Sequence, residues 1–298
     1  MNTVCVICGG TSDERDVSLR SGAAVAEALK SVGHDVDVYD VDVKDNTLQR
    51  FDVVFPVLHG KGGEDGVIQK RLETAGVCFV GTGSTASALC MDKTRYREAM
   101  IAAGIKMPAG VVVTAASFAA SPLSQRPYVL KPVNGGSTID TLIVHSPPHN
   151  DTAALAEVFA KHTNLLLEEL ITGTEITVGV FGGDALPVIE IIPPEGADFD
   201  YANKYNGKTQ ELCPPQHVST EQQQAAQALA LQVHALAGCR DMSRTDFIID
   251  ESGVIYLLET NTIPGMTAQS LYPKMAAAAG IDFPSLCDRL VHMALSRR

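Results

Sequence analysis

One stretch in the last fifth of the chain decides the fold: Thr245-Asp246-Phe247-Ile248-Ile249-Asp250-Glu251-Ser252-Gly253-Val254-Ile255-Tyr256-Leu257-Leu258-Glu259-Thr260-Asn261. Two apolar runs flank a short polar turn, which is typical of a β-hairpin. Antiparallel pairing around that turn places Asp246 within one residue of Glu259, and Asn261 shares a face of its strand with Glu259. Two carboxylates and an amide oxygen then meet at one end of the hairpin, a set that suits Mg²⁺. The alternative is that they are solvated charges at strand ends.

Short apolar runs alternate with helical stretches elsewhere in the chain, so the predicted fold class is α/β. Three units are predicted, over residues 1–81, 82–171 and 172–298. The expected strands lie at 4–8, 36–39, 53–57, 77–80, 110–114, 128–131, 141–145 and 165–169, and the expected helices at 16–32, 86–103 and 152–162. In the last unit the capping box Ser219-Thr-Glu-Gln222 predicts a helix that runs to Ala237 and stops at Gly238.

Composition excludes several classes of protein. The net charge of the 298 residues is −12, which leaves no basic surface for a nucleic acid. No apolar run approaches the ~18 residues that cross a bilayer, and the first residues are typical of a strand and not of a signal peptide. The seven cysteines have no paired spacing, and Cys5 and Cys8 should point to opposite faces of one strand. We therefore expect a cytoplasmic protein without disulfides or a membrane partner.

A second candidate site follows a predicted strand, in the sequence Val129-Leu130-Lys131-Pro132-Val133-Asn134-Gly135-Gly136-Ser137-Thr138. A lysine at a strand end before a Gly-Gly-Ser-Thr loop can surround a polyphosphate with N–H groups, hydroxyls and an ammonium. The sequence does not match the P-loop pattern G-x-x-x-x-G-K-[ST]. An ordinary hairpin turn is the alternative.

Three further features are candidates for substrate binding. Glu14 either completes a capping box with Thr11 or points a carboxylate at a substrate ammonium from a strand–helix crevice. His59 precedes a loop with four glycines in eight positions, which favours a polar site residue over a core histidine. Residues 193–217 contain four prolines and no clear period, and such long loops are usually lids. This loop carries side chains suited to closing over phosphate, namely Tyr201, Lys204, Tyr205 and Lys208.

Taken together, these motifs resemble those of the D-alanine–D-alanine ligases in the ATP-grasp superfamily, over essentially the whole chain. They occur in family order: Gly9-Gly-Thr-Ser-Asp-Glu-Arg-Asp-Val-Ser18, His59-Gly-Lys-Gly-Gly-Glu-Asp-Gly66, Met91-Asp-Lys93, the Lys131 strand, Tyr201-Ala-Asn-Lys-Tyr205, Arg244-Thr-Asp246 and Glu259-Thr-Asn-Thr-Ile-Pro-Gly-Met-Thr267. Any one motif is modest evidence, but this many in one order is specific.

The resemblance implies a three-domain ATP-grasp fold that begins with an open α/β sheet and holds ATP between the second and third domains. It implies that the carboxylate of a first D-alanine takes the γ-phosphoryl group of ATP. The amine of a second D-alanine then attacks the acyl phosphate, and phosphate leaves a tetrahedral intermediate, as a step of peptidoglycan precursor synthesis. Two Mg²⁺ ions, which Mn²⁺ can replace, and a homodimer are also implied.

The resemblance assigns one group of residues to the nucleotide and the metal ions. Lys93 and Lys131 would hold the α- and β-phosphates, and Glu175 would bind the ribose hydroxyls. The adenine site would be lined, mainly through backbone groups, by Glu168, Glu169, Leu170 and Ile171. The metal ligands would be Asp246, Glu259 and Asn261.

A second group is assigned to the two amino acids. Glu14 would bind the ammonium of the first D-alanine, supported by Ser18 and His59. Ser270 and the Leu271 N–H would hold the carboxylate of the second.

A third group is assigned to the intermediate and the lid. Arg244 and the Gly265 N–H would stabilise negative charge on the tetrahedral intermediate, and Lys204 the transferred phosphoryl group. Ser137 and Tyr205 would lock the lid through hydrogen bonds that reach Glu14.

Two positions depart from the usual family pattern, and three other functions compete. Asp140 puts an anion beside the expected phosphates, and Ser243 precedes Arg244 where glycine is usual.

The rival functions are a ligase that takes D-lactate or D-serine as its second substrate, another ATP-grasp carboxylate–amine ligase, and a catalytically silent nucleotide-binding protein. In relatives that make the ester, the position of Tyr205 resembles a histidine, so a neutral tyrosine favours D-alanine. The retained Arg244 argues against a silent protein, because a mere binder needs no oxyanion arginine.

Overall fold

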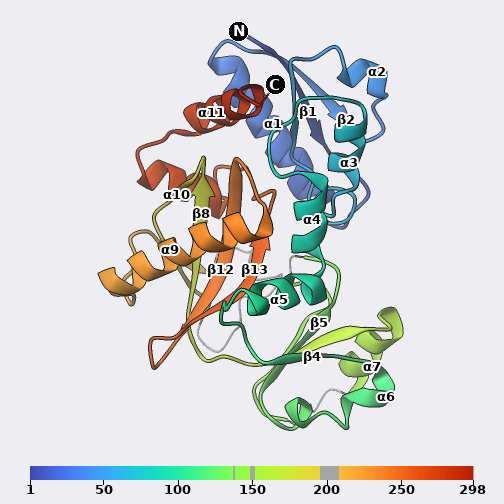
Figure 1. Ribbon diagram of the computed structural model, residues 1–298, viewed down its shortest axis with the longest axis vertical. Helices are drawn as coiled ribbons and strands as arrows, with labels where there is room; N and C mark the ends of the chain where they lie inside the picture. Colours follow the sequence, from blue (N-terminus) through green and yellow to red (C-terminus); the bar gives the residue numbers. More distant parts are fainter. Residues whose placement is uncertain (137, 148–151, 195–207, 298) are drawn as a thin grey trace.

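The computed structural model describes residues 1–136, 138–147, 152–194 and 208–297. Its three sheets follow one another along the chain. Along the long axis of the molecule, the third sheet lies between the first, at the top of Figure 1, and the middle one, at the bottom. Each sheet falls within one of the three predicted units, while the domain boundaries themselves stay a prediction. Within the described residues, no helix combines the length and apolar character needed to span a membrane.

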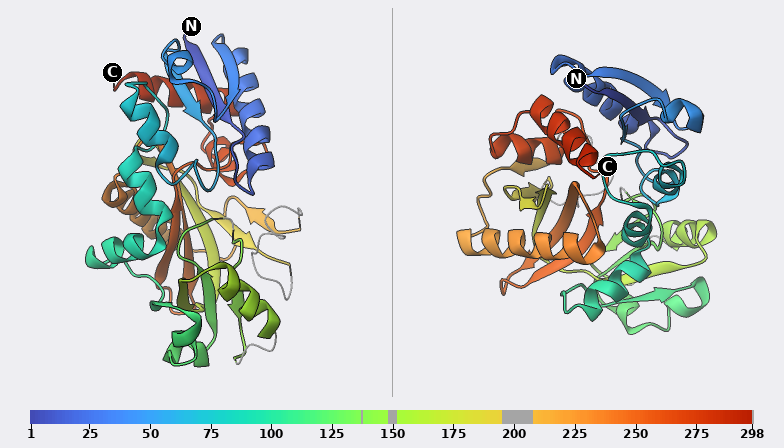
Figure 2. Two further views of the ribbon diagram at one scale, coloured as in Figure 1. Left: turned by 90° about the vertical axis from the view of Figure 1, so that its right-hand side faces the viewer. Right: turned by 45° about the horizontal axis from the view of Figure 1, so that its top comes forward.

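The first sheet is parallel, with the order β2-β1-β3. Its strands are β1 (Thr3–Cys8), β2 (Asp35–Asp40) and β3 (Val53–Pro56). One face of the sheet packs against α1 (Arg15–Ser31) and the C-terminal helix α11 (Phe283–Leu295). The other face packs against α2 (Asp45–Leu48) and α3 (Val67–Thr74). Figure 2 shows this part of the molecule from two further sides. Burial on both faces explains why these strands are nearly continuous apolar runs. Cys5 and Cys8 lie in the two opposite cores, as predicted, and both are free thiols.

Two local predictions for the first half of the chain were wrong, and one of the two alternatives for Glu14 is excluded. The strand expected at 77–80 is an isolated bridge between Phe79 and Val54. The helix expected at 86–103 is two helices, α4 (Ser84–Met91) and α5 (Lys93–Ala102), because the Asp92 carboxylate accepts the N–H groups of Thr94 and Arg95 and starts a new helix. The capping box at residues 11–14 does not form, since Glu14 is itself the N-cap of α1 and makes no side-chain cap.

The middle sheet is antiparallel, with the order β4-β7-β5-β6. It comprises β4 (Gly110–Val113), β5 (Tyr128–Pro132), β6 (Leu142–Val144) and β7 (Leu165–Glu169). Alternate side chains such as Leu130 and Leu167 pack under α7 (Thr152–Lys161), α6 (Ala115–Phe118) and a 3₁₀ helix (Pro122–Gln125). The same alternation leaves Lys131 and Glu168 together on the opposite face.

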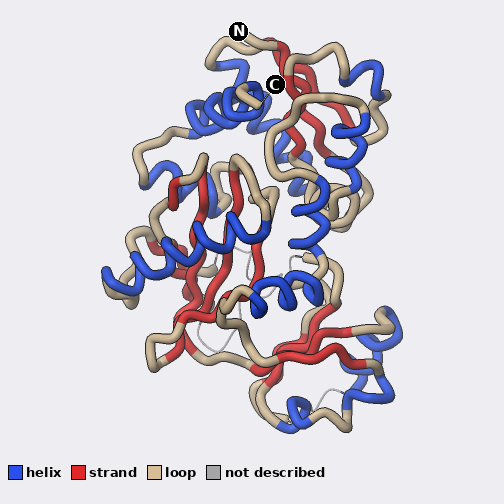
Figure 3. The backbone as a smooth tube through the Cα atoms, viewed as in Figure 1, coloured by secondary structure: helices blue, strands red, loops and turns tan. Residues whose placement is uncertain are grey.

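The third sheet has the order β11-β10-β8-β12-β13, with β9 paired to β8. Figure 3 shows its long strands in red in the middle of the molecule. Its strands are β8 (Gly173–Phe181), β9 (Asp184–Ala185), β10 (Ile189–Ile192), β11 (Gln210–Leu212), β12 (Met242–Asp250) and β13 (Ile255–Asn261). Helix α9 (Thr220–Ala237) covers one face, with the predicted capping box at Ser219 and a left-handed Gly238 (φ 72°) as its stop. Helix α10 (Leu271–Ala278) packs against the other face through Tyr272 and Met275, beside Gly179.

The predicted hairpin is β12 and β13, and Asp246 pairs directly with Glu259. A bulge follows, because the next residue, Phe247, pairs with Leu257. Phe247 and Leu257 pack in the core beneath α9, whereas the extra residue allows Leu258 and Glu259, although consecutive, both to line the opposite side. Bulges re-aim side chains in this way beside functional sites.

The C-terminal end of the chain fastens the first sheet to the third. The Arg297 guanidinium donates to the Asp241 carboxylate and, over 3.0 Å, to the Phe79 carbonyl. The same carboxylate accepts the Gly81 N–H at 2.7 Å, and the Arg240 Nε donates to the Gly81 carbonyl at 2.6 Å. The link between the first and second units is therefore held at the start of β12.

We expect Arg297→Ala to lower the free energy of unfolding by about 2–4 kcal/mol, because it leaves the Asp241 carboxylate buried without its cation. Urea unfolding followed by circular dichroism measures the change. Arg50→Ala, an exposed arginine, is the control. A loss no larger than that of the control would mean that the Gly81 N–H alone satisfies Asp241.

Candidate active site

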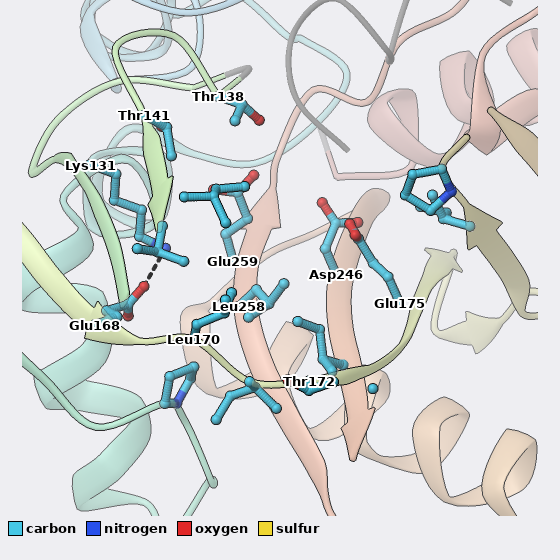
Figure 4. Close-up of a pocket in the computed structure, with 18 of the residues that line it drawn as sticks. Lys131, Thr138, Thr141, Glu168, Leu170, Thr172, Glu175, Asp246, Leu258 and Glu259 are labelled. Carbon is cyan, nitrogen blue, oxygen red and sulfur yellow. Dashed lines mark ion pairs between the residues drawn. The ribbon is translucent and has the colours of Figure 1, made fainter. Parts of the chain in front are cut away.

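A cavity of about 550 Å³ lies between the middle and third sheets. Figure 4 shows side chains from β5, β7, β8, β12 and β13 converging on it. All the residues assigned to ATP line this cavity: Lys93, Lys131, Glu168, Glu169, Leu170, Ile171 and Glu175. Two of the three assigned metal ligands, Asp246 and Glu259, also line it. The cavity thus brings together assigned residues that lie up to 166 positions apart in the sequence, from Lys93 to Glu259.

One part of the cavity wall is apolar and suits a planar base. Its members come from five strands and the segment after β7: Val129, Ile143, Leu170, Ile191, Ile248 and Leu258. The N–H groups of Glu169 and Leu170 already donate to the carbonyls of Ala109 and Pro127, at 2.8 and 3.0 Å. Other groups of residues 168–171 would therefore have to contact the edge of the base.

The cationic part of the cavity comes from Lys93 and Lys131. The Lys93 ammonium donates to the Gly135 carbonyl, and the Lys93 N–H to the Val133 carbonyl at 3.0 Å, so this lysine is joined to the glycine-rich loop. The Lys131 ammonium lies 2.6 Å from the Glu168 carboxylate, the ion pair drawn in Figure 4. Both lysines are held by groups that a polyphosphate would compete with.

Asp140, the departure from the family pattern, does not present a free anion to this region. Its carboxylate contacts the His162 Nε2 at 2.8 Å and the Lys161 Nζ at 2.9 Å. Hydrogen bonds from His162 and then Lys161 hold the pKa of Asp140 below its ordinary value. The residue joins the loop to the end of α7, and its charge is balanced there.

The Asp246 carboxylate is the most heavily bonded group at the hairpin end. It accepts the Thr177 hydroxyl at 2.6 Å, the Arg244 Nε and Nη2 at 3.0 and 2.8 Å, and the Asn261 amide at 3.2 Å. In Figure 4, Asp246 and Glu259 extend from neighbouring strands toward the same side of the cavity. Carboxylate and amide oxygens on two paired strands are hard ligands, so these residues fit a divalent cation such as Mg²⁺.

Arg244 connects the cavity to a second group of polar residues, in which Glu14 and His59 are buried and Glu64 is partly buried. Burial alone would lower the pKa of Arg244, but the charge and hydrogen bonds of Asp246, followed by Glu259 and Glu64, raise it above the ordinary value. Burial, and then the Arg244 charge, lower the pKa of His59 to about 4, so this imidazole is neutral. The His59 Nε2 has no hydrogen-bond partner among the described residues. His59 is therefore buried with one ring nitrogen unsatisfied among the described residues, and its role in the site stays a prediction.

Glu64 is a site residue that we did not predict, although it belongs to the quoted His59–Gly66 motif. Its carboxyl accepts the Gly60 N–H at 2.9 Å and lies close to Glu14, Arg244 and the Ile263 N–H. Burial, and then the Glu14 charge, raise the pKa of Glu64 to about 8. The glutamate in this motif was the available signal, but its burial against Glu14 depends on tertiary structure.

Glu14 lies where the first sheet meets the glycine-rich loop of the middle one. It is only 7% exposed, and a Cβ added to Gly60 or Gly136 would lie 2.8 or 3.9 Å from its Oε2. The Ser18 hydroxyl is instead engaged within the first sheet, because it donates to the Val57 carbonyl and accepts the Gly9 N–H. The geometry gives Ser18 the role of fastening the ends of β1 and β3.

The residues assigned to the second carboxylate lie at the N-terminus of α10. Ser270 is the N-cap, Leu271 begins the helix, and no side-chain cap is made among the described residues. The Ser270 hydroxyl instead contacts Thr267, and a Cβ on Gly265 would lie 2.8 Å from it. Uncapped N–H groups at a helix start favour an anion such as a carboxylate.

Comparison with known proteins accords with this geometry. A family model described as "D-ala D-ala ligase C-terminus" matches residues 104–292, and one described as "D-ala D-ala ligase N-terminus" matches residues 40–82. This chain belongs to the D-alanine–D-alanine ligase family. The family resemblance found in the sequence and the predicted ATP-grasp fold class are both confirmed.

Relatives and solved structures of this ligase family cover nearly the whole chain. The D-alanine–D-alanine ligase of Rhizorhabdus wittichii is 41% identical over 98% of this chain and 96% of its own length, and that of Gluconobacter oxydans is 42% identical over 99% of both. The crystal structure of the Bacillus anthracis ligase complexed with ATP superposes with a TM-score of 0.85 at 29% identity, covering 100% of this chain and 98% of that one. The VanG D-Ala:D-Ser ligase of Enterococcus faecalis gives 0.83 at 31% identity, over 98% and 99%.

Three assigned residues of the ligase site, Ser137, Lys204 and Tyr205, lie outside the described residues. The proposed lid lock and the contact to the transferred phosphoryl group therefore stay predictions from the sequence.

We expect the stability of this ligase to fall as the pH rises from about 4.5 to about 8, relative to Glu64→Gln. A carboxyl whose folded pKa is raised binds more protons in the native state than in the unfolded state throughout that window, so unfolding becomes easier by up to about 1.4 kcal/mol per pH unit. Urea unfolding of both proteins at several pH values between 5 and 8.5 measures the difference. Parallel pH profiles would show that Glu64 titrates normally.

Proposed function

We propose that this chain uses ATP to join two molecules of D-alanine into D-alanyl-D-alanine, with release of ADP and phosphate. The proposal is carried by the position of Arg244, whose guanidinium contacts Asp246 at the nucleotide cavity and also lies close to the Glu14, His59 and Glu64 cluster. One cation therefore adjoins both the place where phosphate would be activated and the place where an amino acid would bind. Membership of the D-alanine–D-alanine ligase family supports the same reaction.

In the first step, the carboxylate of one D-alanine takes the γ-phosphoryl group of ATP. Lys93 and Lys131 would neutralise the α- and β-phosphates, the apolar wall would hold the base, and Glu175 would bind the ribose. Glu14 would anchor the ammonium of the D-alanine, and the neighbouring Glu64, held neutral by burial, adds no second charge there. Phosphoryl transfer needs mainly this positioning and charge neutralisation.

In the second step, the free amine of another D-alanine attacks the carbonyl of the acyl phosphate, and phosphate leaves. The uncapped start of α10 at Ser270 and Leu271 would hold the carboxylate of the incoming molecule. Arg244, with the Gly265 N–H, would stabilise the negative charge that develops on the carbonyl oxygen. Lys204 would accompany the phosphoryl group, while Ser137 and Tyr205 would close the lid and exclude water, which would hydrolyse the acyl phosphate.

Asp246, Glu259 and Asn261 would hold two Mg²⁺ ions, for which Mn²⁺ can substitute. When bound, such ions supply electrostatic stabilisation of the phosphate oxygens. The chain's contribution is the paired register of Asp246 and Glu259, which brings two carboxylates to one place. Cytoplasmic location and a homodimeric assembly complete the proposal.

The identity of the second substrate separates this proposal from its rivals. We expect D-alanine, ATP and Mg²⁺ to give D-alanyl-D-alanine, ADP and phosphate, and D-lactate or D-serine supplied at equal concentration to give little mixed product at neutral pH. Mass spectrometry of the products with coupled ADP detection measures this. Glu259→Gln should lower turnover by orders of magnitude without unfolding the protein. Depsipeptide or D-alanyl-D-serine as the main product would refute the assigned substrate, and ADP release without any ligation would leave only nucleotide binding.

Arg244→Ala should lower kcat far more than it raises the KM for ATP, because an oxyanion contact acts chiefly in the transition state. Loss of one such donor costs about 3–4 kcal/mol, or roughly 10²–10³ in rate. Steady-state kinetics with ATP and D-alanine varied separately gives both constants. A mutant that showed only a raised KM for ATP would place Arg244 in the nucleotide site.

A further inference from the structure

Three charged side chains form a buried row at the edge of the nucleotide cavity. Glu168 on β7 accepts from the Arg97 Nη1 at 2.5 Å on one carboxylate oxygen and pairs with the Lys131 Nζ at 2.6 Å on the other. Arg97, on α5, also donates to the Pro108 carbonyl at 2.8 Å. Arg97 and Glu168 are only 7% and 3% exposed. Lys131 lines the cavity, whereas Arg97 lies behind Glu168 and is not part of its lining.

The charge of this row depends on Arg97. Lys131 and Glu168 alone sum to zero, so a phosphate entering the cavity would meet a neutral pair and would have to take the ammonium from its carboxylate. With Arg97 the row carries one net positive charge, and the member of the row that lines the cavity is the Lys131 ammonium. Charges at such short separations interact by several kcal/mol when they are partly buried, so the difference is large enough to affect nucleotide binding.

The local sequence makes room for this arrangement. Gly110 on β4 pairs with Glu168 across the strands, and a Cβ at that position would lie 2.9 Å from the Arg97 Nη2 and 3.0 Å from the Glu168 Cγ. The guanidinium therefore occupies the space that a side chain on β4 would fill. Arg97, Gly110 and Glu168 fit together as one unit, although they come from three different elements.

We propose that Arg97 is a positioning residue for ATP, which neutralises and fixes Glu168 so that the Lys131 ammonium keeps its charge for the nucleotide phosphates. Arg97 touches no substrate itself and acts through Glu168. This inference rests on the proposed function only in that the cavity holds ATP.

The test is a double-mutant cycle on nucleotide binding. Arg97→Met is made in the wild type and in a Glu168→Gln background, and the Kd for ADP with Mg²⁺ is measured by calorimetry alongside kcat and both KM values. In the wild type we expect the Kd for ADP and the KM for ATP to rise about tenfold to a hundredfold, with the KM for D-alanine nearly unchanged. In the Glu168→Gln background Arg97→Met should change the Kd by less than about twofold, since no carboxylate is left to neutralise. Arg97→Lys should restore most of the binding.

The matched control is Arg95→Met, because Arg95 lies on the same helix but is exposed, and its nucleotide binding should equal that of the wild type. An equal loss of binding in both backgrounds would overturn the proposal, since it would make Arg97 a purely structural residue. A Kd for ADP that Arg97→Met leaves unchanged in the wild type would also overturn it. If Arg97→Met does not fold, Gly110→Ala, which crowds the same contact while keeping every charge, takes its place in the cycle and the same comparison decides. If the cycle shows that ADP binding depends on Arg97 but the wild-type protein makes no dipeptide, the proposed function is refuted and this inference stands.

Discussion

The bidentate contact between Arg244 and Asp246 is the interaction on which the rest of the site depends. Both residues lie on β12, between β8 and β13, so their separation is set by one strand and does not vary with the arrangement of the domains. Asp246 faces the nucleotide cavity, and the guanidinium extends from it toward the buried group around His59 and Glu64. The bulge after Asp246 adds Glu259 to the same side. A hairpin that paired in the wrong register would keep Arg244 beside Asp246 but would move Glu259 away from both.

Buried charges in this chain are balanced in small local sets. Asp246 has Arg244, Asp241 has Arg297, and Glu168 has both Arg97 and Lys131. Unpaired burial of a charge is costly enough that each set must either contain both signs or lose its charge by protonation. Several of these sets join segments far apart in sequence, and Asp241 with Arg297 joins the last described residue to the link between the first two units. The charge pairs therefore help to place the sheets relative to one another, together with an apolar cluster that joins the first sheet to the third.

Local signals predicted the parts of the fold that local physics determines. The hairpin, the α9 capping box with its Gly238 stop, and the opposite facing of Cys5 and Cys8 depend on spacing within a few residues, and each is confirmed. The break at Asp92 was missed because the apolar pattern continues through it, while a single carboxylate in an N-cap geometry ends the helix. Packing of α11 against α1, the burial of Glu64 and the contact of Arg97 with Glu168 need contacts between distant segments, which one sequence does not display. The roles of the site residues came largely from the resemblance to the family and stay predictions, and three of those residues lie outside the described ones.

At both the nucleotide end and the amino-acid end of the site, a protein carboxylate lies beside a substrate-binding cation, and its charge is cancelled in a different way at each end. A protein cation attracts a substrate anion less strongly when a nearby carboxylate of the protein forms an ion pair with it. At the nucleotide end that carboxylate is Glu168, and Arg97 cancels its charge from behind. At the amino-acid end it is Glu64, and burial beside Glu14 raises its pKa to about 8, so that a proton cancels its charge at neutral pH. If Glu64 were ionised, Arg244 would be shared among three carboxylates and would attract a developing oxyanion less. Arginine suits the first position because a guanidinium stays charged when buried, and a carboxylic acid suits the second because its neutral form leaves Glu14 as the only negative charge of the pair to meet an ammonium.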